Sequence, residues 1–320
     1  MLQQSLHEHL SNGSDEAQNE NKLRKLGSGT FGTVYFTTAT PQVYKKCHRI
    51  ENSPILAEEY RHLKAIHKAL SESGNLIQSP TPLDFHDSND DEFWDEVKLM
   101  FPSSGSTRTG VLSMSRVYPM PSALRARLID LFCPEDLQDR KASILRRGHH
   151  VARLLLGRAE PDNARAAPQR FFRTYNFPLT RMRAEKLGID TIELSKEMGR
   201  MLAQMHMTAR NDARDIEIVL GANITSTRTY NKYREPRAWV IDFNQVKDFN
   251  FTEEQISLLV DAFFANEAYF PRARTADDLY NVFADAYIDE CQKIGEDARK
   301  LGKQFIVALE AEQARRDKDK

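Results

Sequence analysis

The 320-residue sequence predicts a two-lobed α+β fold, with a small antiparallel-sheet lobe followed by a larger, mostly helical lobe. Three observations predict this fold class. A glycine-rich turn separates short runs of strand-forming residues near the N-terminus, an apolar strand over 111–118 runs into Pro119 and Pro121, and helical apolar stripes dominate the remainder. Because proline favours extended backbone before it, we expect residues 111–118 to lead into a crossing between the lobes, with a cleft there.

The expected boundaries follow from changes in composition. Residues 22–118 form the predicted small lobe and residues 119–320 the large lobe, while the polar residues 1–21 are predicted to be a disordered tail. Residues 84–110 become acidic and then small and polar, which we interpret as an exposed insertion. The charged residues 310–320 are interpreted as a fraying helix end.

The glycine-rich turn is the most informative motif. Three glycines at GxGxxG spacing let backbone N–H groups surround a polyphosphate. The same spacing occurs in dinucleotide-binding folds, where the third glycine opens a helix. Here β-branched and aromatic residues follow instead, so we expect a strand. The candidate phosphate-binding residues of this turn are Gly27, Ser28, Gly29, Thr30, Gly32 and Val34.

A lysine and a glutamate follow the turn at informative positions. Lys45 lies on the next predicted strand, residues 42–47, and Glu59 lies on a helix predicted to start at Ser53. Glu59 falls on the apolar stripe of that helix, where an unpaired carboxylate would cost several kcal/mol. We therefore expect Glu59 to hold Lys45 toward the phosphates; the alternative is that both side chains are simply solvated.

Two aspartates flank apolar strands in the large lobe. Asp215 precedes the strand predicted at 216–220, where it could accept a hydroxyl proton, and Asp242 follows the strand 238–241, where it could hold Mg²⁺ on the phosphates. Each could instead only cap a turn. The arginine-rich residues 139–158 are interpreted as a solvated helix face, with an anionic partner as the alternative. Asp190 is predicted to cap a helix whose methionines pack in the core.

Composition excludes several classes of partner. The formal net charge of -1 gives no general attraction to nucleic acid or to an anionic membrane. The longest apolar stretches are too short to span a bilayer, and the three cysteines have neither paired nor metal-ligand spacing. We expect a reduced intracellular protein in the cytoplasm, with the nucleus as an alternative.

In their order along the chain, these motifs resemble the protein-kinase-like superfamily. The glycine turn, Lys45 and Glu59 match its phosphate loop, strand lysine and helix glutamate. His206 and the tripeptide ending in Asp215 stand where the superfamily has His-Arg-Asp, and the tripeptide 242–244 stands where it has Asp-Phe-Gly. More specifically, most of residues 22–290 resembles the fungal DUF3669 family, on the segments 175–179, 205–206, 212–221, 241–245, 262–264 and 269–271.

This resemblance implies a kinase-like fold that uses ATP and Mg²⁺, in some members joined to a zinc finger. The sequence lacks the cysteine pairs of such a finger, so DNA binding is not expected. It also departs from active kinases, because Leu220 replaces a metal-binding asparagine and Glu217 replaces a lysine. Asn223 and Asn244 are candidate replacements for the missing asparagine.

Two functions therefore stay open. One is an ATP- and Mg²⁺-dependent phosphotransferase, with Asp215 as base and Asp242 as metal ligand. Because no protein-kinase activation segment follows Asp242, its expected acceptor is a small hydroxylated molecule, as in aminoglycoside-type kinases. The other is a pseudokinase that regulates or scaffolds a protein partner. The loop predicted at 222–236 is long for the superfamily, and helices are expected to begin near Thr252 and Thr275.

Overall fold

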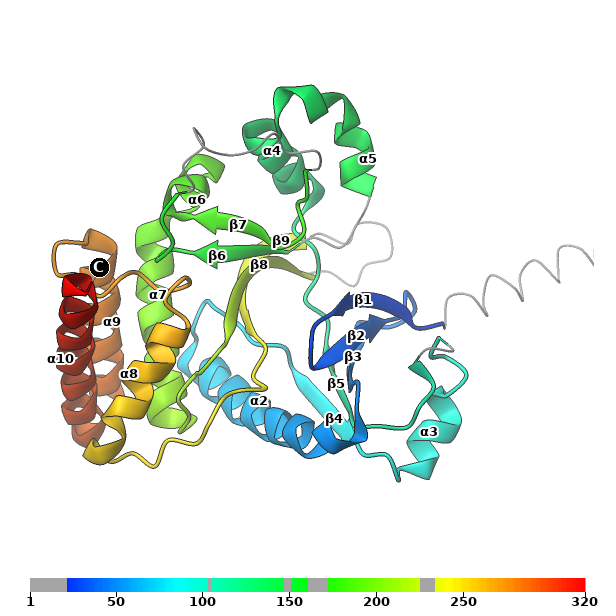
Figure 1. The fold of residues 1–320 in the computed structure, drawn as a ribbon, viewed down its shortest axis with the longest axis horizontal. Coiled ribbons are helices and arrows are strands. Elements are labelled where there is room, and N and C mark those ends of the chain that lie inside the picture. Colours follow the sequence, from blue (N-terminus) through cyan, green and yellow to red (C-terminus); the bar gives the residue numbers. More distant parts are fainter. Residues whose placement is uncertain (1–21, 103–104, 147–150, 161–171, 225–233, 320) are drawn as a thin grey trace, which may run out of the picture. The chain divides into compact units, whose positions relative to one another are not determined.

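The computed structural model describes residues 22–102, 105–146, 151–160, 172–224 and 234–319 (Figure 1). The tail predicted at 1–21 lies outside these residues. The chain divides into two compact units, Met1–Arg61 with Thr81–Arg116, and His62–Pro80 with Val117–Lys320. The last junction, between Arg116 and Val117, lies two residues before the lobe boundary predicted at 118, whereas residues 62–80 group with the second unit.

The first unit contains a five-stranded antiparallel sheet. Its strands are β1 (Arg24–Ser28), β2 (Gly32–Phe36), β3 (Gln42–Cys47), β4 (Pro82–His86) and β5 (Val111–Ser115), in the order β1-β2-β3-β5-β4. The central strands are rich in β-branched and aromatic residues, which fit a pleated, half-buried surface. The small antiparallel sheet expected from the sequence is therefore present.

Helix α2 (Ser53–Ser73) follows a short 3₁₀ turn, η1 (Ile50–Asn52), and the division between the units falls within it. Its predicted apolar stripe is buried at Leu56, Leu63, Ile66 and Leu70. Glu59 is on the same stripe and is also buried. The periodicity of the sequence therefore predicted both the helix and the burial of one acidic side chain.

The prediction of an exposed insertion over 84–110 is wrong. The segment contains most of β4 and the helix α3 (Asp91–Val97), whose first turn is capped by Asp90 accepting from the N–H of Phe93 at 3.0 Å. Phe93, Trp94 and Val97 are buried in an aromatic cluster with Phe101 and residues of the sheet. Composition hid this helix because the acidic residues occupy its outer face while the apolar ones share the inner face.

The second unit contains a four-stranded sheet in the order β7-β6-β8-β9. Its strands are β6 (Ala152–Leu155), β7 (Phe177–Thr180), β8 (Glu217–Ile224) and β9 (Arg234–Ile241); β6 and β7 are parallel and the other pairs antiparallel. Two expectations are corrected. Residues 152–155 form a strand and not a solvated helix face, and the predicted loop over 222–236 is shorter because β8 and β9 extend into it.

Helices make up most of the second unit, as expected. They are α4 (Ser122–Phe132), η3 (Glu135–Arg140), α5 (Lys141–Arg146), α6 (Arg181–Leu187), α7 (Thr191–Ala203), the π-helical turn η5 (Gln204–Thr208), η6 (Glu253–Gln255), α8 (Ile256–Ala265), α9 (Asp278–Ile294) and α10 (Glu296–Lys318). Helices α7, α9 and α10 lie side by side (Figure 1). None of the helices within the described ranges is long and apolar enough to cross a bilayer.

Close packing of α7 on α9 depends on Gly199. A Cβ atom at this position would lie 2.3 Å from the carbonyl oxygen of Phe283, which no side chain tolerates without movement. Asp190 caps α7 by accepting from the N–H of Glu193 at 3.0 Å, and Met198 and Met201 are fully buried. The predicted cap and the predicted core role of the methionines are both confirmed.

The C-terminal end of α10 is anchored, so its interpretation as a fraying tail is wrong. The guanidinium of Arg274 donates to both carboxylate oxygens of Asp317 at 2.7 Å. Arg316 stacks on Phe264 at 3.9 Å from the ring centroid, and Gln313 is buried. The high density of charged residues therefore did not indicate that specific contacts hold this end of the helix.

Candidate functional site

The predicted site residues fall on both units, and each group is considered by itself. In the first unit, β1 and β2 form a hairpin with a connection over 29–31, closed by the N–H of Gly29 donating to the carbonyl of Gly32 at 3.0 Å. A Cβ atom on Gly32 would lie 2.6 Å from the carbonyl oxygen of Lys46, whereas one on Gly29 would meet no atom within 4 Å. Gly32 thus permits close strand packing, and Gly29 leaves open space over the turn.

The remaining predicted turn residues differ in what they contact. Gly27 pairs with Val34 after an irregularity in the β1–β2 register. Ser28 and Thr33 share a hydrogen bond of 2.7 Å between their hydroxyl groups, and the Thr33 hydroxyl lies 3.0 Å from His48 Nε2. Thr30 is exposed at the tip. The hydroxyl of Ser28 is therefore engaged in bracing the hairpin base, while the tip faces solvent.

Lys45 and Glu59 form the expected ion pair. Lys45 lies on β3 between Val34 of β2 and Leu112 of β5, and its Nζ atom donates to Glu59 Oε1 at 2.7 Å. The side chains of Lys45 and Glu59 are only 11% and 3% exposed. The Lys45 ammonium also lies 5.6 Å from the ring centroid of Phe31, at the tip of the glycine turn. A buried, carboxylate-held ammonium is thus within reach of the turn.

In the second unit, the β8–β9 register brings Asp215 and Asp242 to the same end of the hairpin. Glu217 pairs with Ile241, so Asp215 lies just before β8 and Asp242 just after β9. Both aspartates have left-handed backbone, with φ of 57° and 66°. Non-glycine residues adopt this conformation at a cost of roughly 1–3 kcal/mol, and it clusters at functional sites. The two conformations mark this end of the sheet as a candidate site.

The charges of the two aspartates interact. Partial burial raises the pKa of the Asp215 carboxyl, and the neighbouring Asp242 charge raises it further. Arg214, a hydrogen bond from Gln245 Nε2 and the charge of Arg153 oppose this rise. The Asp215 carboxyl is therefore a stronger base than an isolated aspartate.

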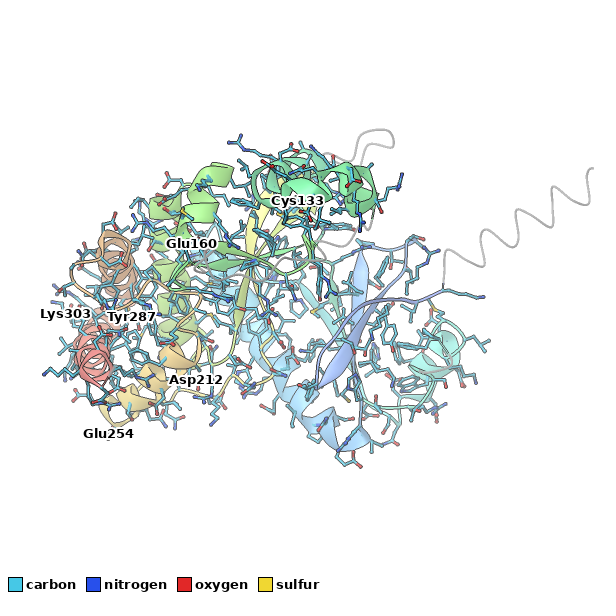
Figure 2. The ribbon with its side chains drawn as sticks, turned by 45° about the horizontal axis from the view of Figure 1, so that its top comes forward. Cys133, Glu160, Asp212, Glu254, Tyr287 and Lys303 are labelled. Atoms are coloured by element: carbon cyan, nitrogen blue, oxygen red, sulfur yellow. The ribbon has the colours of Figure 1, made fainter. Side chains whose placement is uncertain are left out.

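Asp212 holds the backbone around Asp215, although no role for it was predicted. Its Oδ1 atom accepts from the N–H of Arg214 at 3.0 Å and from that of Lys247 at 2.9 Å. Its own N–H donates to the Lys247 carbonyl at 2.9 Å (Asp212 is labelled in Figure 2). These bonds tie the segment before β8 to the segment after β9. A side-chain oxygen two residues before a turn N–H is the local signal for such a role.

Arg153 was predicted only as part of the arginine-rich run 139–158, and no role was predicted for Tyr269. Arg153 Nη2 on β6 donates to Glu217 Oε1 on β8, and this ion pair is only part-buried. Burial raises the pKa of the Tyr269 hydroxyl, with added effects from Glu217, Asp215 and Asp242. The Tyr269 phenol therefore stays protonated beside this cluster of charges. Tyr269 falls within a segment that carries the family resemblance, but without a role there.

The structure places Leu220, which departs from active kinases, and the two asparagines that could replace the missing metal ligand. Leu220 is buried in the sheet, paired with Ala152 of β6 and Ala238 of β9. Asn223 lies six residues along β8 from Glu217, about 20 Å away at ~3.3 Å per residue. The aspartates lie beyond Glu217, so Asn223 cannot share an ion with Asp242. Asn244 Oδ1 is buried and accepts no hydrogen bond in the part of the chain that the structure describes. Asn244 is the candidate that geometry retains.

Metal sites of the zinc type are not apparent in the described residues. These contain no group of three or more His, Cys, Asp or Glu side chains arranged to hold a metal ion, and Cys47, Cys133 and Cys291 are buried free thiols. An oxygen-ligated Mg²⁺ site needs fewer protein ligands, because it keeps waters and takes ligands from phosphates.

A comparison with protein-family models gives a match near the end of the chain. Residues 238–299 match the model of the DUF3669 family, which carries the description zinc finger protein. No curated protein matches the chain. The matched segment includes the end of β9, Asp242, Asn244 and Tyr269, together with helices α8 and α9. Over this segment, which is less than a quarter of its length, the chain is similar to the DUF3669 family.

Proposed function

We propose that this chain is a kinase-like protein that binds ATP with Mg²⁺ and transfers phosphate to a small hydroxylated molecule. The observation that carries the proposal is the buried Lys45–Glu59 ion pair, 2.7 Å long and within reach of Phe31 on the glycine turn. A lysine held by a helix carboxylate is fixed in direction, and its ammonium suits the α- and β-phosphates of a nucleotide. The open space over Gly29 allows backbone N–H groups to approach those phosphates.

Asp242 would hold the magnesium ion, with Asn244 as the candidate second ligand. Their oxygen atoms are the hard ligands that Mg²⁺ prefers, and the buried Oδ1 of Asn244 lacks a hydrogen bond among the described residues. The charge of Asp242, which adds to the effect of burial in raising the pKa of Asp215, would be offset by a divalent cation. When bound, Mg²⁺ would neutralise charge on the phosphates.

Asp215 is the proposed base for the acceptor hydroxyl. Its side chain is exposed, so an acceptor can reach it, and Gln245 orients one of its carboxylate oxygens. The raised pKa increases its proton affinity, which favours general-base catalysis near neutral pH. The hydrogen bonds of Asp212 hold the preceding turn in place.

Thermal unfolding of the full chain with ATP, with and without Mg²⁺, tests nucleotide binding. A ligand at about 100 times its dissociation constant stabilises the folded state by roughly 2.7 kcal/mol. Lys45→Met should abolish this shift, whereas Lys25→Met, at an exposed lysine of β1, should retain it. Asp242→Asn should remove the part of the shift that depends on Mg²⁺. Absence of any ATP-dependent shift in the wild-type chain would reject the proposal.

A pseudokinase is the second candidate, and the burial of Leu220 favours it. An active kinase has a metal-binding asparagine at that position, and here the side chain is packed between two strands. In this case the chain binds nucleotide, or none, and acts through a protein partner. Phosphate release from ATP, measured in wild type and in Asp215→Asn, distinguishes the two. Equal background rates in both proteins would leave only the binding role.

A further inference from the structure

We propose that Arg153 contacts the terminal phosphate of ATP and that Glu217 is the positioning residue that holds it there. This inference rests on the proposed function. Arg153 lies on β6, next to β8, where it pairs with Val219. Its guanidinium reaches Glu217, two residues nearer to the end of β8 that carries Asp215. The cation is thus brought to the end of the sheet where the proposed base lies.

The surroundings of Arg153 support this placement. Its charge opposes the rise in the pKa of the Asp215 carboxyl, so the two side chains are close enough to interact. It acts in the same way on the hydroxyl of Tyr269. A phosphate that is transferred to a hydroxyl beside Asp215 must come close to Asp215. Arg153 is therefore near the terminal phosphate and not near the nucleoside.

The guanidinium retains capacity for a ligand. Arginine has five N–H donors in a planar fork that matches phosphate oxygens. Glu217 takes a hydrogen bond from Nη2, and Nε donates none within the described residues. The Arg153 side chain is 35% exposed, so solvent and ligands reach it. A carboxylate that binds one edge of the fork fixes its direction without saturating it.

Local charge makes the contact depend on Mg²⁺. Three acidic side chains, Asp215, Glu217 and Asp242, and two arginines, Arg153 and Arg214, act on this cluster electrostatically. One net negative charge repels a polyphosphate that arrives alone. A divalent cation held by Asp242 would reverse the sign, so Arg153 should contribute to polyphosphate binding only when Mg²⁺ is present.

A purely structural role for the Arg153–Glu217 pair would be to join β6 to β8. The experiment separates the roles by comparing two ligands. Calorimetric titration of the full chain with ATP and with ADP, each with Mg²⁺, gives the ATP/ADP affinity ratio. Arg153→Met should weaken ATP binding about tenfold or more and change ADP binding by less than about twofold, because it loses one charge-assisted contact that ADP lacks. Arg181→Met, which removes an exposed arginine bound to Asp278, is the matched control and should leave both affinities unchanged.

Two further variants keep the test decisive. Arg153→Lys keeps the charge and removes the planar fork of donors, so it should fold even if Arg153→Met does not. Its affinity for ATP should again fall more than its affinity for ADP. Glu217→Gln should give a smaller loss that is also selective for ATP. Equal loss of ATP and ADP affinity, or an unchanged ratio in both Arg153 variants, would overturn the role of Arg153 while nucleotide binding stands. A wild-type chain that binds neither nucleotide would overturn the proposed function and this inference with it.

Discussion

The buried His206 should make the stability of the second unit depend on pH. It lies in η5, directly after α7, and its ring packs edge-on against Tyr287 and Phe305 with centroid separations of 5.7 and 5.2 Å. Nδ1 of His206 lies 2.8 Å from the Tyr287 hydroxyl, which is labelled in Figure 2. Complete burial lowers the pKa of His206 to about 3, with a smaller opposing effect from the Asp212 backbone.

The size of the effect follows from the difference in pKa between the two states. An unfolded histidine has a pKa of about 6.5, so the folded pKa is about 3.5 units lower, equivalent to about 5 kcal/mol. Below pH 6.5 the unfolded chain binds a proton at His206 that the folded chain does not. Stability from this residue is therefore complete above pH 6.5 and falls as pH decreases toward 3. By pH 5 the loss is about 2 kcal/mol.

Urea unfolding between pH 7 and pH 5 measures this loss. The chain has two tryptophans, one in each unit, so fluorescence of a Trp94→Phe protein reports the second unit through buried Trp239. His206→Gln removes the titrating group and should reduce the decline in unfolding free energy by about 2 kcal/mol over this range. His67→Gln, at a part-buried histidine that bonds Ser79, is the control. Parallel declines in wild type and His206→Gln would refute the reasoning.

Three further predictions concern packing and are measured by urea unfolding, with Trp94 fluorescence for the first unit and Trp239 for the second. Lys45→Met and Glu59→Leu should each lower the free energy of unfolding by about 3–5 kcal/mol, because each leaves one charge buried without its partner. The double variant should lose less than either single variant, and additive losses would contradict this. Gly32→Ala should cost about 1–3 kcal/mol, because its Cβ atom would lie 2.6 Å from a backbone carbonyl of β3, whereas Gly29→Ala should cost almost nothing. Gly199→Ala should cost at least as much as Gly32→Ala, since its Cβ atom would lie 2.3 Å from a backbone carbonyl of α9; an unchanged midpoint would show that α7 moves without penalty.

Local periodicity accounts for the parts of the fold that the sequence predicted. The stripe on α2, the strand β3 and the capped start of α7 each depend on residues within one element. Segments with mixed composition were misread. The arginines around β6 masked a four-residue strand, which is too short for its alternation to stand out. The acidic residues of α3 likewise outweighed the three apolar residues that bury it.

In the candidate site, too, the sequence predicted the contact between neighbouring elements but not the contact between distant ones. Lys45 and Glu59 lie on neighbouring elements, and the need of a buried carboxylate for a cation was enough to pair them. Arg153 and Glu217 are 64 residues apart, and only the β6–β8 register brings them together. The sequence carries no signal for that register, because the order of strands along the chain does not determine that β6 pairs with β8.

Glu217 and Leu220, the two departures from active kinases, bear differently on whether the chain could transfer phosphate. Glu217 reverses the charge expected at its position, but Arg153 returns a cation to the same end of β8, so the local loss of positive charge is largely compensated. Leu220 has no such compensation on its own strand, since it is packed between Ala152 and Ala238 and Asn223 lies too far along β8. Under the proposed function, a second metal ligand would come from Asn244, whose Oδ1 is the one buried side-chain acceptor near Asp242 in the sequence that lacks a hydrogen bond within the described residues. The choice between phosphotransferase and pseudokinase therefore depends on metal binding more than on the reversed charge at Glu217.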